Sequence, residues 1–340
     1  MAREDGADVG IDQVTVSVHV APHPDALVAL LVDQLADPPA DPFAPELIAV
    51  PTRGIERWLT QQIASGLAAR RIGDGIAANI EFPSPRRLVH EVLLAVPELA
   101  ASVDAWQGPE LVAHVLGAID HHAAATWMRL IERYIKTADG TPGPNRITAA
   151  TKIAALFSSY ARRRPEMVRA WSEGDDVGPD GAPIPDGDAW QPRLWRLVRE
   201  QIGIPALAEF LPAGLDPIRS GDIQIDLPDR LSVYGLTATD PLDIQVIAAL
   251  GEQHDVDLYV LHPSPALWAS VVPEVPIGPP SRDADSTADL ADHPLLRSWG
   301  RDARELQLVL AAAGLTATPT EAPDPEPTTL LAQLQHDIRS

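Results

Sequence analysis

The chain has 340 residues, of which 45% are hydrophobic and 5% aromatic, and its formal net charge is −22. This composition is typical of a globular protein with two or three domains, and no run of about 18 apolar residues is present to span a bilayer. The absence of cysteine excludes disulfides and thiolate metal sites and agrees with a cytoplasmic location. The acidic N-terminus lacks the pattern of a signal peptide, so we expect no membrane partner.

Positive charge is concentrated in two basic islands, although the net charge of −22 argues against nucleic acid as a partner. Residues 51–90 hold six arginines against three acidic residues, and residues 129–170 hold seven arginines and two lysines against three acidic residues. Two interpretations are open for these islands. They are either ordinary variation of surface charge in an arginine-rich protein or electrostatic footprints for a polyanion.

Strand and helix patterns alternate three times at the beginning of the chain. Residues 14–20 alternate apolar and polar side chains, as a strand does, and a helical pattern follows from residue 25. The continuous apolar run 47–50 precedes a second helical pattern, and the short strand 75–82 precedes a helix over 86–96. This order predicts an α/β fold with a parallel sheet and with ligand sites at the carboxyl ends of its strands.

The middle of the chain is predicted to be helical. Helical spacing without a convincing strand marks three segments, 111–119, 127–135 and 153–160. We therefore expect an all-helical insertion domain over about 101–210.

Strand signals return after this insertion, at 231–236 and 256–261, with a helix over 242–250 between them. The simplest topology has these strands rejoin the first sheet, so that 14–100 and 220–315 form one discontinuous domain. Beyond the strands we expect a loop over 263–292, a helix over 293–313 and a linker within 316–340.

The loop at 21–26 lies where an α/β protein often binds phosphate, but it lacks the required chemistry. A P-loop cradles phosphates with glycine amides and neutralises them with a lysine. Here Pro22 and Pro24, which have no amide hydrogen, flank His23. The strand 231–236, where an acidic Mg²⁺ ligand is expected, carries Tyr234 and no carboxylate. We predict a degenerate nucleotide site and no ATP hydrolysis by this chain.

Other catalytic and metal-binding patterns are also missing from the sequence. There is no GxSxG motif, and the adjacent His121 and His122 lack the i, i+4 spacing of helical zinc ligands. We therefore assign no catalytic residue and no metal ligand in this chain.

The basic islands supply the candidate binding residues. Arg53 and Arg57 share one face at the start of a helix, next to the free amides and Thr52. The following helix should begin at the same sheet edge, and helix starts that carry arginines suit a phosphodiester backbone. The candidate DNA-binding residues are Thr52, Arg53, Arg57, Ser84, Arg86, Arg87, His90, Arg162, Arg163 and Arg164. The alternative is that these arginines pair with acidic residues of other domains.

Several long stretches of the sequence resemble one known family, the gamma subunit of exodeoxyribonuclease V, RecC of the RecBCD helicase–nuclease. They occur in family order and cover almost all of residues 14–340. The most specific are DPFAPELIAVPTRGIERWL (41–59), GIAANIEFPSP (75–85), KIAALFSSYARRRPEMVRAW (152–171), LSVYGLTATDPLDIQVIAALG (231–251) and HPLLRSWGRDARELQLVL (293–310).

The resemblance implies the fold of a superfamily 1 helicase that has lost its motor motifs and its P-loop. It implies a non-catalytic DNA-binding subunit that helps to split the duplex in recombinational double-strand break repair. The subunit would hold the strand ending in 3′ and scan it for a recombination hotspot. Its partners would be DNA and the beta and alpha subunits, which would use ATP and Mg²⁺ and carry the helicase and nuclease activities.

Two departures from the family pattern are visible. Family members are much longer, with a second motor-like domain toward which 316–340 would be a linker. Well-known members also carry uncharged polar side chains at positions that here hold Pro51, Arg53, Arg57 and His90. The chain would then read another sequence or contact only phosphates. The alternative function is a protein-interaction scaffold within the same complex that never touches DNA.

Overall fold

Six parallel strands form the centre of the molecule, in the lateral order β3-β2-β4-β5-β1-β6. The computed structural model describes residues 16–37, 39, 41, 43–70, 75–136, 143–271, 285–320 and 328–339, so that Val14 and Thr15 of the expected first strand lie outside it. The strands are β1 (Val16–Ala21), β2 (Glu46–Ala49), β3 (Ile80–Glu81), β4 (Arg230–Leu236), β5 (Asp255–Leu261) and β6 (Ala317–Pro319). Because β4 and β5 lie between β2 and β1, the prediction that the late strands rejoin the first sheet is confirmed.

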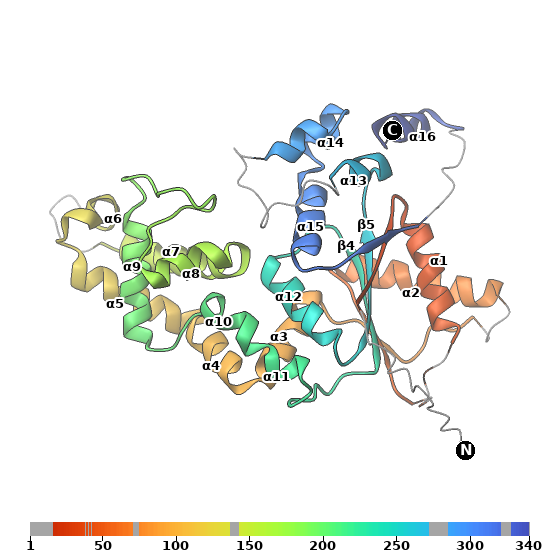
Figure 1. The fold of residues 1–340 in the computed structure, drawn as a ribbon, viewed down its shortest axis with the longest axis horizontal. Helices are drawn as coiled ribbons and strands as arrows, with labels where there is room; N and C mark the ends of the chain where they lie inside the picture. Colours follow the sequence, from red (N-terminus) through yellow and green to blue (C-terminus); the bar gives the residue numbers. More distant parts are fainter. Residues whose placement is uncertain are drawn as a thin grey trace, which may run out of the picture.

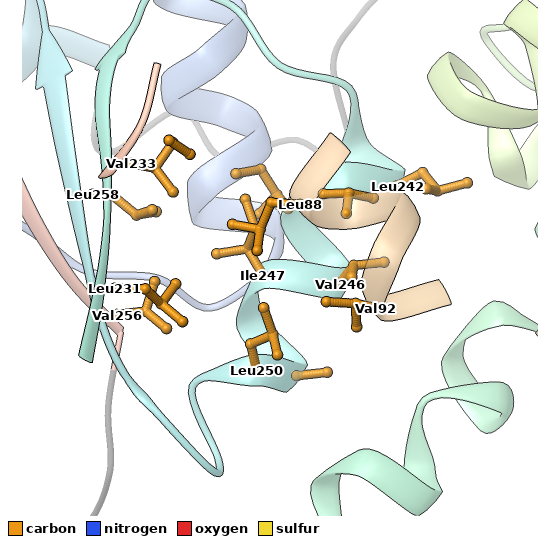
Figure 2. Close-up of a cluster of buried hydrophobic side chains, with 14 of the residues drawn as sticks. Leu88, Val92, Leu231, Val233, Leu242, Val246, Ile247, Leu250, Val256 and Leu258 are labelled. Atoms are coloured by element: carbon orange, nitrogen blue, oxygen red, sulfur yellow. The ribbon is translucent and has the colours of Figure 1, made fainter. Parts of the chain in front are cut away.

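Helices cover both faces of this sheet. The helices α1 (Pro24–Leu35) and α2 (Arg53–Ala69) pack on one face, and α3 (Pro85–Ala95), α12 (Pro241–Leu250) and α15 (Arg301–Ala312) pack on the other. Figure 2 shows Leu231 and Val233 of β4 beside the side chains of α3 and α12. Tyr234, the next residue, belongs to the cluster under α1 and α2, because successive side chains of a strand point to opposite faces.

A second group of helices lies beside the sheet, away from α1 and α2 (Figure 1). Its elements are α4 (Pro97–Ala105), α5 (Gly108–His122), η1 (Thr126–Met128), α6 (Arg129–Ile135), α7 (Asn145–Arg163), α8 (Pro165–Glu173), α9 (Trp190–Ile202), α10 (Leu207–Gly214) and α11 (Asp216–Arg219). Helices α5 to α9 enclose their own core around Trp171 and Trp195, whereas Leu99 and Val103 of α4 join the core of the sheet. No helix in the described part of the chain is long and apolar enough to cross a membrane.

The C-terminal third contains more regular structure than the sequence predicts. The prediction of a loop over 263–292 is wrong at two places, where the structure has α13 (Pro265–Val271) and η3 (Ser286–Leu290). In α13 the side chains of Leu267, Trp268 and Val271 are buried. The single helix expected over 293–313 is two helices, α14 (Pro294–Ser298) and α15. They meet at Gly300, where a Cβ atom would lie 2.4 Å from the carbonyl oxygen of Leu296.

The segment 316–340, interpreted as a linker, contains both a strand and a helix. Strand β6 pairs with β1 at the edge of the sheet, which extends the sheet by one strand. Helix α16 (Leu330–Arg339) is held at its end, where the Ser264 hydroxyl donates to the carbonyl of Arg339 at 2.6 Å. The proline-rich composition indicated an extended chain, and the pairing of β6 comes from its contact with a strand almost 300 residues away in sequence.

Candidate nucleic-acid interface

The carboxyl edge of the sheet gathers the starts of α2, α3 and α12, because all of its strands are parallel. Thr52 caps α2 by accepting a hydrogen bond from the amide of Ile55 at 3.3 Å, and Ser84 caps α3 by accepting one from the amide of Arg87 at 3.2 Å. The two starts are joined where the amide of Val50 donates to the carbonyl of Pro83 at 2.9 Å. The structure therefore brings together the two predicted sets of residues from the first basic island.

Arg53 and Arg57 are both exposed at the beginning of α2. Among the residues that the structure describes, no carboxylate lies within ion-pair distance of either guanidinium group. Arg87 on α3 is also exposed and pairs with Glu91 at 2.8 Å, one helical turn further on. An exposed pair of this kind contributes little to stability. Arg53 and Arg57 thus present two uncompensated positive charges at the edge of the sheet.

The second basic island reaches the same edge from the helical group. Asp240, which precedes α12, receives Arg162 Nε at 3.1 Å and Arg163 Nε at 3.2 Å, both from the end of α7. Arg86 Nη2 of α3 lies 3.7 Å from the same carboxylate, and Arg162 Nη2 also binds Asp243 at 2.5 Å. We call these five residues the Asp240 cluster. Three guanidinium groups from two helices therefore converge on two carboxylates.

Burial shifts the pKa of the more deeply placed carboxyl group of the cluster. Asp243 is 8% exposed, and burial raises its pKa, an effect that the charge of Arg162 opposes and the charge of Asp240 reinforces. Asp240 stands before the first turn of α12, where a negative charge is favoured by the free amides of the helix. The Asp240 cluster therefore joins α7 of the helical group to the sheet through charge as well as packing.

Arg164, the third consecutive arginine, does not join the Asp240 cluster. It precedes α8, and burial lowers its pKa, while the nearby Glu305 of α15 raises it and Arg301 lowers it. The three arginines therefore divide between two neighbours, since Arg162 and Arg163 face α12 and Arg164 faces α15. The sequence predicted that the three arginines form one basic patch, and the packing of α7 gives them different neighbours.

Two clefts open beside the Asp240 cluster. One, of about 480 Å³, is lined by residues that include Pro51, Ser84, Arg86, Arg163, the end of β4 with the loop 237–240, and Asp302 and Glu305 of α15. The other, of about 520 Å³, lies between α3 and the helical group and is lined by apolar residues together with Arg86, Arg87, His90 and Arg162. Most of the predicted binding residues therefore border one or both clefts.

The predicted degenerate nucleotide site lies between the end of β1 and Tyr234 of β4, whose side chain belongs to the cluster under α1 and α2. Tyr234 is buried, and its hydroxyl donates to the carbonyl of Pro24 at 2.9 Å, which ties β4 to the first turn of α1. His23 Nε2 lies 3.0 Å from Arg339 Nη1 of α16. The hollow beside Pro22 measures about 30 Å³, the volume of one water molecule, whereas small-molecule sites measure about 300–1,000 Å³.

Asp240 and Asp243 are the residues that sequence reasoning missed. The order Asp240-Pro241 at the start of an apolar helical pattern is typical of an N-cap followed by proline at the first helical position. In the structure the Asp240 side chain caps no amide and binds arginines instead. The sequence signal predicts where the helix begins, and it contains nothing about the partners of Asp240, which lie 77 to 154 residues away in sequence.

The fold and this edge define a parallel-sheet α/β protein that is joined to a helical group and carries arginines at the carboxyl ends of its strands. Comparison with known proteins then identifies the family, because residues 17–340 match the family described as RecC, N-terminal domain. The chain belongs to the RecC family.

Individual relatives agree with this assignment. The chain is 35% identical over 334 residues to the RecBCD enzyme subunit RecC of Mycobacterium tuberculosis (strain ATCC 25618 / H37Rv), covering 96% of this chain and 29% of that protein. The RecBCD enzyme subunit RecC of Mycolicibacterium smegmatis is 32% identical over 331 residues, and that of Escherichia coli (strain K12) is 24% identical over 328 residues. The chain spans less than a third of the length of these relatives.

Proposed function

We propose that this chain acts as the N-terminal portion of a RecC-type subunit in a RecBCD-type enzyme. The observation that carries the proposal is the match to the RecC N-terminal domain over residues 17–340. In this proposal the chain works in the cytoplasm with beta- and alpha-type partner subunits. Those subunits use ATP and Mg²⁺ and carry out unwinding and strand cleavage during recombinational repair.

We infer that residues 14–100 and 220–315 form a motor-like domain that lacks a working nucleotide site, with 101–210 as its inserted helical domain. The all-parallel sheet and the loop between β1 and α1 support this inference. Two residues without an amide hydrogen, Pro22 in that loop and Pro24 at the first position of α1, replace the donors that hold a phosphate. The Tyr234 hydroxyl donates a hydrogen bond to the carbonyl of Pro24. The adjacent hollow of about 30 Å³ is too small for a nucleotide.

The proposed role of the chain is to hold DNA, in particular the strand ending in 3′, along the carboxyl edge of the sheet. The exposed guanidinium groups of Arg53, Arg57 and Arg87 at the starts of α2 and α3 support phosphate contacts there. Arginine makes paired hydrogen bonds to phosphate oxygens and keeps its charge at any physiological pH. Scanning of the held strand for a hotspot sequence belongs to the same proposal.

Site-specific photocrosslinking tests whether this edge meets DNA. A photoreactive amino acid replaces Arg53 or Arg86, and the complex with its partner subunits is irradiated on a forked duplex. We expect crosslinks to the single-stranded arm from both positions. The matched control replaces Glu252, an exposed residue at the opposite edge of the sheet, where no crosslink is expected. Equal crosslinking from the control position, or none from 53 and 86, removes the proposed contact.

A second function, a protein-interaction scaffold without DNA contact, is favoured by two observations. Arg86, Arg162 and Arg163 of the predicted binding set already have carboxylate partners within the chain. Helix α16 exposes three leucines, Leu330, Leu331 and Leu334, as protein-binding helices do. This function predicts tight association with the partner subunits together with an absence of crosslinks from both arginine positions.

A further inference from the structure

The Asp240 cluster contains arginines that differ in how firmly they are held. The Arg162 side chain is 24% exposed and bonds to two carboxylates, one of them on the buried Asp243. The side chains of Arg163 and Arg86 are 68% and 72% exposed, and among the described carboxylates each pairs with Asp240 alone, at 3.2 and 3.7 Å. Arg162 is therefore a fixed member of the cluster, whereas Arg86 and Arg163 have weak, solvent-screened contacts.

Asp240 itself is almost covered, since its side chain is 13% exposed, and both of its oxygens face arginines. A carboxylate in this position offers two planar oxygens to guanidinium groups, as a phosphate does. Arg86, Arg163 and Asp240 also line the same cleft of about 480 Å³ at the carboxyl edge of the sheet. An anionic strand that enters this cleft therefore meets arginines that an internal carboxylate already occupies.

We infer that Asp240 is an internal competitor of DNA phosphate and sets the affinity of this edge for a single strand, an inference that rests on the proposed DNA role of the chain. A bound phosphate takes Arg86 and Arg163 from Asp240, while Arg162 stays with Asp243 and keeps α7 attached to α12. Asp240 weakens binding in two ways, because it must release the two arginines and because it repels the incoming phosphate. The competition weakens the binding of an isolated small anion, whereas a strand that contacts Arg53 and Arg57 as well compensates for it.

The test compares two variants. One removes the competing charge of Asp240, and the other removes a second acidic charge from the same cleft. Asp240→Asn removes a carboxylate that holds arginines, and Asp302→Asn removes one that lines the same cleft without an ion-pair partner among the described residues. Binding of a fluorescein-labelled forked oligonucleotide is measured by anisotropy with the full chain. We expect Asp240→Asn to bind about fivefold more tightly or better, the size of one charge interaction near 4 Å in water. Asp302→Asn should change the affinity by less than about twofold, because it frees no arginine.

A double variant locates the origin of the gain. Adding Arg163→Gln to Asp240→Asn should remove most of the increased affinity, since the gain comes from the arginine that Asp240 releases. Equal gains from Asp240→Asn and Asp302→Asn would mean that only net charge matters, and this result overturns the inference. Unchanged or weaker binding by Asp240→Asn overturns it as well.

Folding and the underlying DNA role are checked separately. Asp240→Ser, which retains a side chain suited to the start of a helix, replaces Asp240→Asn if the latter fails to fold by tryptophan fluorescence. Failure of both variants to fold makes Asp240 a structural residue and overturns the inference. Binding by the natural chain without a gain in the variants refutes only the competition, whereas no binding by any of these proteins refutes the proposed DNA role too.

Discussion

Removing two charges from the start of α2 should weaken DNA binding by a calculable amount. Arg53 and Arg57 are exposed, lie one helical turn apart and have no carboxylate partner among the described residues. Arg53→Gln combined with Arg57→Gln therefore removes two free positive charges without uncovering a buried acid. The Thr52 cap of α2 and the buried residues Leu59 and Ile63 are untouched, so the helix should keep its position.

The size of the effect follows from counterion release. Each arginine–phosphate contact on a single strand contributes about 0.7 to the slope of log K against log salt concentration. At about 0.15 M salt this amounts to roughly a fourfold change in affinity per contact. Loss of both contacts should weaken binding by about tenfold to twentyfold and reduce the salt slope by about 1.4.

Fluorescence anisotropy with a labelled single-stranded oligonucleotide over a series of salt concentrations measures both quantities. Arg70→Gln is the matched control, because Arg70 lies at the other end of α2, where it pairs with Asp33 at 2.7 Å. This control removes the same kind of charge and should leave the slope unchanged. A double variant that keeps the natural slope, or a control that loses as much affinity, would refute the reasoning.

Three further predictions concern stability and can be measured by urea unfolding followed through tryptophan fluorescence. Tyr234→Phe leaves the carbonyl of Pro24 without its donor and should lower the free energy of unfolding by about 1 kcal/mol, whereas an unchanged value would show that this tie is unimportant. Burial lowers the pKa of His262 from 6.5 to about 4, so stability should fall by about 3 kcal/mol as the pH falls from 6.5 to 4, and His262→Gln should abolish that fall. Burial raises the pKa of Asp285, but bonds from Thr287 and the buried Arg304 outweigh this and leave it lower than 3.8. Stability from this pair should therefore be lost only as the pH falls below 3.8, and Asp285→Asn should flatten the curve there.

The placement of the basic residues also explains how a chain with a net charge of −22 can be proposed as a DNA-binding protein. Its positive groups gather at one edge of the sheet from two separate islands. The cleft at that edge also holds four acidic residues, of which Asp240 and Asp243 are paired with arginines. Electrostatic attraction of a strand depends on the local field more than on total charge. The interface is therefore defined by topology, which the overall composition conceals.

The sequence by itself determined the family and the local elements of the sheet domain before residue 262. The continuous apolar run before Pro51 predicts a buried strand, and Ser84-Pro85 predicts the start of α3, because caps, proline and periodicity act over a few residues. The absence of P-loop chemistry around Pro22 is likewise a property of residue types alone. Long matching stretches identify the RecC family without any coordinates.

Only the tertiary structure decided the lateral order of the strands, the pairing of β6 and the partners of the arginines. Arg162 and Arg163 were predicted to bind DNA together with Arg164, and the packing of α7 against α12 gives both of them Asp240 as a partner, which the sequence did not indicate. An ion pair between residues 78 positions apart depends on where two helices meet, and that position depends on the burial of the apolar core as a whole. No local pattern contains this information, because the energy that fixes it comes from contacts between distant segments.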